Sequence, residues 1–169
     1  MISVLTPRPI VFLSAKQMDF VDKIVREGVK KKKAGGARNM HGITPEDDTP
    51  EVAVGAAQAE LALSLFLNVE WASYRKGGPD VGERTQVRSS MRERSSHSLI
   101  VRPRDLELYG DVPFVLVIQK RNRFEVLGWM SSVEATRVGK LCNGGNWKRP
   151  DAWFVHESLL HSLEELTNP

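Results

Sequence analysis

The sequence contains a single cysteine, Cys142, among 169 residues. One cysteine excludes an intramolecular disulfide framework and a zinc cluster built from cysteines. No apolar run approaches the ~20 residues that a transmembrane helix needs. The N-terminus lacks the basic start, apolar stretch and small-residue cleavage site of a secretory signal. We therefore expect a cytoplasmic protein in a reducing environment, with no membrane partner.

Neither the length nor the net charge is extreme. A chain of 169 residues with 41% hydrophobic content suits one domain whose core needs no disulfide or metal support. A net charge of +3 is too small to indicate a nucleic-acid partner by itself. We expect a single domain overall, in which residues 1–50 form a helix and a basic, polar loop packed on a core of residues 51–169.

The distribution of charge is more informative than the total. Residues 1–40 hold nine Lys or Arg and three Asp or Glu, a net charge of +6, so the remaining chain carries a net charge of −3. Two basic stretches on an otherwise mildly acidic chain indicate a surface that faces a polyanion, and a simple solvated face is the alternative. The second basic stretch consists of Arg84, Arg88, Arg92, Arg94, Arg102 and Arg104.

The N-terminal quarter of the chain predicts a short strand and an amphipathic helix. Residues 10–13 are β-prone, and Ser14 with Gln17 forms a capping box at the start of a helix over 15–32. The stretch 34–48 is polar and has no apolar period, which is typical of a long loop with a function or high mobility.

A second helix is expected over residues 51–67. Thr49 and Pro50 are suited to its first turn, and nearly every residue from Ala53 onward is apolar, which implies burial on most sides. Glu60 is the exception in this apolar run. A buried carboxylate needs a cation, a metal ion or a proton as its partner.

From residue 69 the apolar period changes to two, which predicts strands followed by small helices. The fully apolar segment 114–118 should be a central strand. A hairpin turn is expected at 120–123, and the whole order indicates an α/β or α+β domain. The expected strands are 69–74, 85–90, 99–102, 114–119, 124–130 and 153–155, with helices at 133–140 and 156–166.

The sequence Pro79-Asp80-Val81-Gly82, followed by Gln86-Val87-Arg88, is the strongest candidate for a chemical site. Pro79 and Gly82 suit a bend that holds Asp80 at a strand edge, and Gln86 and Arg88 point to the same face of the following strand. An acid, an amide oxygen and a cation can thus converge at one point of a sheet, and Glu60 could supply a second carboxylate.

This arrangement resembles the PD-(D/E)xK nuclease superfamily, in the positions Glu60, Asp80, Gln86 and Arg88. The order of these motifs, continued by 99–102, 114–117 and Gly128-Trp129, is similar to that of small phage and prophage proteins of the superfamily. The resemblance covers about residues 51–160. It implies a restriction-endonuclease-like α/β fold, with a central mixed β-sheet flanked by helices and preceded by the N-terminal amphipathic helix.

The resemblance also implies an activity, which is divalent-metal-dependent hydrolysis of phosphodiester bonds in DNA. Asp80, Glu60 and Gln86 would hold Mg²⁺ or Mn²⁺, and Arg88 would stabilise the charge that develops on the phosphate. Gln86 stands where the family usually has Asp or Glu, and Arg88 stands where it has Lys. The residues expected to contact DNA phosphates are Arg84, Arg92, Arg94, Arg102, Lys30, Lys31, Lys32 and Lys33.

Each of these assignments has a structural alternative. Asp80 can simply cap a turn, Glu60 can form a buried ion pair with Arg88 or Arg102, and the lysine run can be a solvated helix end. The alternative for the whole chain is a nuclease-fold module without catalysis that binds nucleic acid or a protein, including a second copy of itself or a phage protein.

Overall fold

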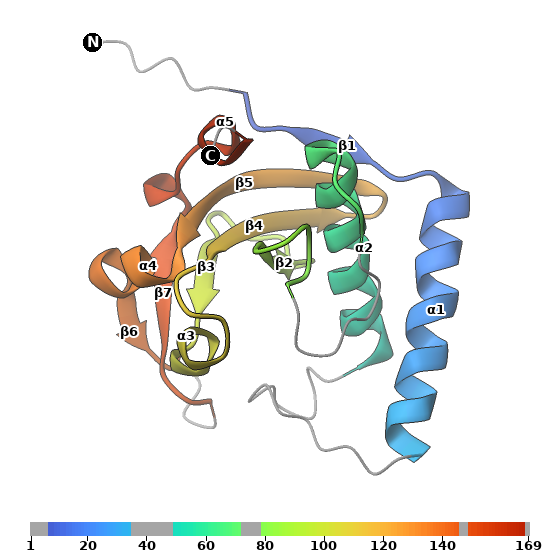
Figure 1. Cartoon of the computed structure of the whole chain (residues 1–169), viewed down its shortest axis with the longest axis horizontal. Helices are drawn as coiled ribbons and strands as arrows, with labels where there is room; N and C mark the ends of the chain where they lie inside the picture. The colour runs from blue at the N-terminus through green and yellow to red at the C-terminus, as the bar shows by residue number, and fades with distance from the viewer. Residues whose placement is uncertain (1–6, 35–48, 72–78, 146–148, 168–169) are drawn as a thin grey trace.

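The computed structural model describes residues 7–34, 49–71, 79–145 and 149–167. These residues form five α-helices, one 3₁₀ helix and seven strands in two sheets, which confirms the α/β class expected from the sequence (Figure 1). In chain order the elements are β1 (Ile10–Phe12), α1 (Ala15–Ala34), α2 (Pro50–Leu67), β2 (Gln86–Ser90), β3 (Ser98–Val101), α3 (Pro103–Tyr109), β4 (Pro113–Lys120), β5 (Arg123–Ser131), α4 (Ser132–Val138), β6 (Lys140–Cys142), β7 (Ala152–His156), η1 (Glu157–Leu159) and α5 (Leu163–Thr167).

The larger sheet is mixed and has four strands in the order β1-β5-β4-β2. β2 runs parallel to β4, whereas β4 with β5 and β5 with β1 are antiparallel. A second, antiparallel sheet has the order β3-β7-β6. In the described part of the chain, β2 is therefore an edge strand, and one row of its backbone groups is not used by the sheet.

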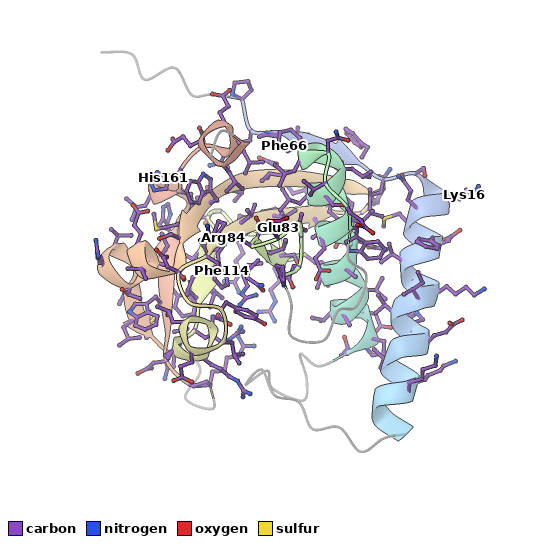
Figure 2. All side chains as sticks on the ribbon, in the orientation of Figure 1. Lys16, Phe66, Glu83, Arg84, Phe114 and His161 are labelled. Atoms are coloured by element: carbon purple, nitrogen blue, oxygen red, sulfur yellow. The ribbon has the colours of Figure 1, made fainter. Side chains whose placement is uncertain are left out.

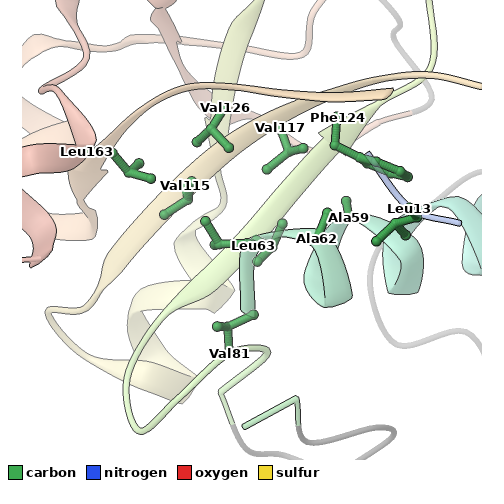
Figure 3. Close-up of a cluster of buried hydrophobic side chains, with 11 residues drawn as sticks. Leu13, Ala59, Ala62, Leu63, Val81, Val115, Val117, Phe124, Val126 and Leu163 are labelled. Atoms are coloured by element: carbon green, nitrogen blue, oxygen red, sulfur yellow. The ribbon is translucent and has the colours of Figure 1, made fainter. Parts of the chain in front are cut away.

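Helix α2 covers one face of the larger sheet (Figures 1 and 3). Its buried Leu63 packs in one cluster with Val115 and Val117 of β4 and Phe124 of β5. The alternate residues of β4, such as Phe114, belong to a second cluster with β3, β7 and α4. Because β4 is buried on both faces, its apolar run has no polar alternation, as expected for a central strand.

The two long helices begin as their capping residues predict. Ser14 accepts a hydrogen bond from the backbone N–H of Gln17, whose side chain accepts one in return from the N–H of Ser14. Thr49 accepts from the N–H of Val52 at the start of α2. Helix α1 then packs on α2 through a separate apolar cluster that includes Val21 and Val25, so α2 lies between α1 and the sheet.

Helix α2 is long and apolar enough to cross a membrane by length and composition alone, so the expectation that the chain has no such run is wrong. The buried core helix of a globular protein passes the same test, and here the buried side of α2 contacts the sheet and α1.

Several expected elements are wrong or incomplete. Residues 69–71 form no strand, and the rest of the expected strand 69–74 lies outside the described residues. The short elements α3 and β6 were not predicted. The expected single helix over 156–166 is divided into η1 and α5, because His161 between them pairs with the backbone of Trp129. The two N–H···O distances of this bridge are 2.9 and 3.1 Å.

Candidate functional site

A tight turn places Asp80 against the free edge of β2. The backbone N–H groups of Asp80 and Val81 donate to the carbonyl of Thr85, at 3.0 and 3.1 Å, and Gly82 in the turn has a φ of +59° that favours glycine. The Asp80 carboxylate accepts a hydrogen bond of 2.8 Å from the N–H of Val87. Asp80 therefore lies at a strand edge as predicted, and it occupies backbone groups that β4 does not use.

Glu60 of α2 lies close enough to Asp80 for their charges to interact. Burial raises the pKa of Glu60 to about 8, and the negative charge of Asp80 adds to this shift. The indole N–H of Trp71, 3.5 Å from Glu60 Oε2, and the positive charge of Arg88 act in the opposite direction. Glu60 and Asp80 are thus near enough for the charge of one to affect the pKa of the other, and we call these two carboxyl groups the Glu60–Asp80 pair.

The raised pKa of Glu60 predicts a pH-dependent stability for the metal-free protein. Between pH 4.5 and about 8 the unfolded chain releases the Glu60 proton while the folded protein retains it. The contribution of Glu60 to the free energy of unfolding should therefore be largest below pH 4.5. This contribution should fall by a few kcal/mol as the pH rises to about 8. Urea denaturation in EDTA across this range measures the effect.

The variant Glu60→Gln should remove most of this pH dependence and should be more stable than the wild type above pH 8, because the amide carries no proton to lose. Glu70→Gln is the matched control, since Glu70 is exposed, and its profile should follow the wild type. Parallel profiles for the wild type and Glu60→Gln would contradict the assignment.

Arg88 makes a set of interactions on the other side of β2. Its guanidinium forms an ion pair of 2.8 Å with Asp105, donates to the carbonyl of Ile100 at 3.2 Å, and lies 4.8 Å from the ring centroid of Phe114. Asp105 also accepts from the backbone N–H of Arg102 at 2.8 Å. Arg88 therefore connects β2 to β3 and α3. The alternative prediction was an ion pair between Glu60 and Arg88 or Arg102, but the acid that pairs with Arg88 is Asp105.

Gln86 lines a hollow at the start of β2. The hollow has a volume of about 360 Å³, and Gln86 is only 2% exposed. Figure 2 shows Glu83 and Arg84 on the turn before β2, which in this orientation lies between the helices labelled α3 and α2 in Figure 1. The hollow is lined by the polar residues Glu83, Arg84, Gln86 and Asp111, and by Pro79, Leu108, Tyr109 and Val112.

The predicted phosphate-binding residues differ in exposure. Arg84, Arg92 and Arg94 are exposed around β2, and Lys30 and Lys31 are exposed near the end of α1. Arg102 is half-buried, and burial followed by the charge of Arg88 lowers its pKa. The side chains of Lys32 and Lys33 lie outside the described residues.

Three residues near the site were missed from the sequence. Trp71 contacts Glu60, Asp105 pairs with Arg88, and Tyr109 lines the hollow beside Gln86. A signal existed for Asp105, because Pro103 and an acid at the third helical position are typical of a helix start. Trp71 and Tyr109 carry no local signal, since only the packing of distant segments brings them to the site.

The relation of the chain to other proteins adds no constraint on the site. Comparisons with family models, curated proteins and solved structures found no match. In the described residues, no group of three or more His, Cys, Asp or Glu side chains is placed to hold a metal ion.

Proposed function

We propose that this protein is a divalent-metal-dependent nuclease that hydrolyses phosphodiester bonds in DNA, with a restriction-endonuclease-like fold. The observation that carries the proposal is the Glu60–Asp80 pair at the edge of β2. The mixed sheet, with α2 on one face and the Asp80 turn leading into β2, supports the same assignment. Both residues are those that the resemblance to PD-(D/E)xK nucleases selects.

The donor atoms of the pair suit Mg²⁺ or Mn²⁺. Mg²⁺ is commonly held by one or two carboxylates while water and substrate phosphates complete its coordination. Two like charges in a partly buried place are costly by themselves, as the raised pKa of Glu60 indicates. A divalent cation removes this cost, lowers the pKa of a bound water and polarises the phosphate.

The remaining residues have supporting roles in this proposal. The carboxylate of Asp80 is oriented by its hydrogen bond from Val87, so it needs little reorganisation on binding a cation. Arg88 contributes positive charge to the site while its guanidinium stays paired with Asp105. The exposed Arg84, Arg92 and Arg94 are suited to phosphate contacts that position the DNA without reading its sequence.

A binding module without catalysis is the second candidate. The observation in its favour is the ion pair of Arg88 with Asp105, because the guanidinium that the resemblance assigns to charge stabilisation on the phosphate is engaged in packing between β2 and α3. Arginine also does not lose its proton near neutral pH, so Arg88 does not serve as a base.

Incubation of the wild-type protein with plasmid DNA separates the two candidates. The nuclease should cleave with Mg²⁺ or Mn²⁺, should stop on addition of EDTA, and should show a metal-dependent rise of several degrees in Tm. The binding module should instead bind DNA in a salt-sensitive way that EDTA does not change. Absence of both cleavage and a metal-dependent Tm shift would contradict the nuclease.

A further inference from the structure

The hollow at the start of β2 is lined by a glutamine whose side chain bonds to no other described residue. Gln86 is 2% exposed and lines the hollow. Within the described ranges, no hydrogen bond joins its side-chain amide to another residue. Neither amide atom of Gln86 is among the fully buried side-chain atoms of the described residues that lack a partner, so the amide opens into the space of the hollow. The amide is therefore placed to form hydrogen bonds with a polar group that enters the hollow.

The walls of the hollow suit a flat, partly apolar ligand. Tyr109, Leu108 and Val112 supply apolar surface, and the volume of about 360 Å³ lies within the ~300–1,000 Å³ typical of small-molecule pockets. Arg84 is exposed at the rim and donates one bond of 3.1 Å to the carbonyl of Asp111. This bond uses one of its five N–H donors, so the guanidinium also has the capacity to contact an anion.

The hollow adjoins the Glu60–Asp80 pair. Pro79 on its wall precedes Asp80 directly, and Gln86 precedes Val87, whose N–H is bound by the Asp80 carboxylate. Burial and the negative charge of Asp80 raise the pKa of Tyr109, so the charge of Asp80 acts on a residue that lines the hollow. A DNA strand with one phosphate at the carboxyl pair would thus have a neighbouring nucleotide beside the hollow.

We propose that the hollow binds an unpaired nucleobase of a DNA strand, with the Gln86 amide hydrogen-bonded to the edge of the base. The amide offers one acceptor and two donors, the combination with which glutamine recognises base edges. A base inside a duplex is stacked and paired and does not reach such a hollow, whereas a base in single-stranded DNA does. The proposal rests on the proposed function for the position of the phosphate, and it adds selection of single-stranded DNA.

Fluorescence anisotropy of the metal-free protein tests the proposal in EDTA at low salt. The probes are a short labelled single strand and the blunt duplex of the same sequence. The wild type should bind the single strand about tenfold more tightly. Gln86→Leu should remove this preference while raising Tm by about 2–4 °C, because it replaces an unpaired buried amide with an apolar side chain of similar size.

Gln58→Leu provides the matched control. Gln58 is equally buried, but it accepts a hydrogen bond of 2.8 Å from Gln119. This variant should lower Tm and leave the preference for single strands unchanged. If Gln86 serves to bind a ligand, replacement by leucine should raise Tm at position 86 and lower it at position 58.

Equal binding of single strand and duplex by the wild type, or an unchanged preference in Gln86→Leu, would overturn the proposal. Because EDTA removes metal ions, a role of Gln86 as a metal ligand does not affect this result. Plasmid cleavage with Mg²⁺ is measured separately. Cleavage without a strand preference leaves the nuclease in place and rejects the base-binding hollow, whereas a Gln86-dependent preference without cleavage supports the hollow and rejects the nuclease.

Discussion

Replacing Asp80 with asparagine should reduce metal-dependent DNA cleavage about a thousandfold or more. The amide oxygen of Asn can still accept the hydrogen bond from Val87, so the turn before β2 should keep its geometry. The change removes the negative charge that a divalent cation requires, and several kcal/mol of transition-state stabilisation correspond to a loss of this size. Initial rates of plasmid cleavage in Mg²⁺ or Mn²⁺ measure the effect.

Two further measurements separate a loss of metal binding from a loss of folding. Asp80→Asn should have no metal-dependent rise in Tm, and its urea profile in EDTA should show a lower pKa for Glu60, because the neighbouring charge is gone. Asp151→Asn is the control, since Asp151 is exposed and should retain full activity. Cleavage by Asp80→Asn at the wild-type rate would exclude the Glu60–Asp80 pair as the catalytic centre.

Replacing Arg88 with methionine should lower the free energy of unfolding by about 3–5 kcal/mol. Asp105 has only 8% of its side chain exposed, and the variant leaves this carboxylate without its partner at 2.8 Å. The bond to Ile100 and the contact with the ring of Phe114 are lost as well. Chemical denaturation at pH 7 measures the change.

The double variant Arg88→Met with Asp105→Leu tests the cause. If the loss comes from an unpaired buried charge, an apolar pair should restore much of the stability, because a buried ion pair is often replaced by packed apolar residues without loss. Arg26→Met is the surface control, since Arg26 pairs with exposed acids on α1 and α2 and should contribute little. A small loss in Arg88→Met would show that Arg88 does not secure β2 to α3.

Much of the fold could be predicted because local signals and tertiary packing agree. The apolar run of β4 has no polar alternation, and the structure buries this strand on both faces. The caps at Ser14 and Thr49 satisfy backbone groups within one helical turn, so the start of each helix is determined by three or four residues. Such features do not depend on distant parts of the chain.

The arrangement around the site could be predicted only in part. The proximity of Glu60 and Asp80 follows from the resemblance, since nothing in either segment alone relates α2 to the turn before β2. The pairing of Arg88 with Asp105 was missed because α3 was not expected. Periodicity over 156–166 predicts a continuous helix, and the competing backbone bridge between His161 and Trp129 is non-local.

Both β1 and the segment around His161 pair with β5, and this affects the order in which the chain folds. Residues of β1 pair with β5 across more than a hundred positions, and His161 pairs with Trp129 beside Gly128. A side chain at Gly128, which has a φ of +148°, would approach the carbonyl of His161 to 2.5 Å. The antiparallel hairpin of β4 and β5 can form early from local contacts. The pairing of β5 with β1 and with His161 joins residues far apart in the sequence and should form later. A ribosome-bound chain that stops before residue 161 should thus leave the backbone of Trp129 without its partner, and addition of the remaining residues should complete the packing on β5.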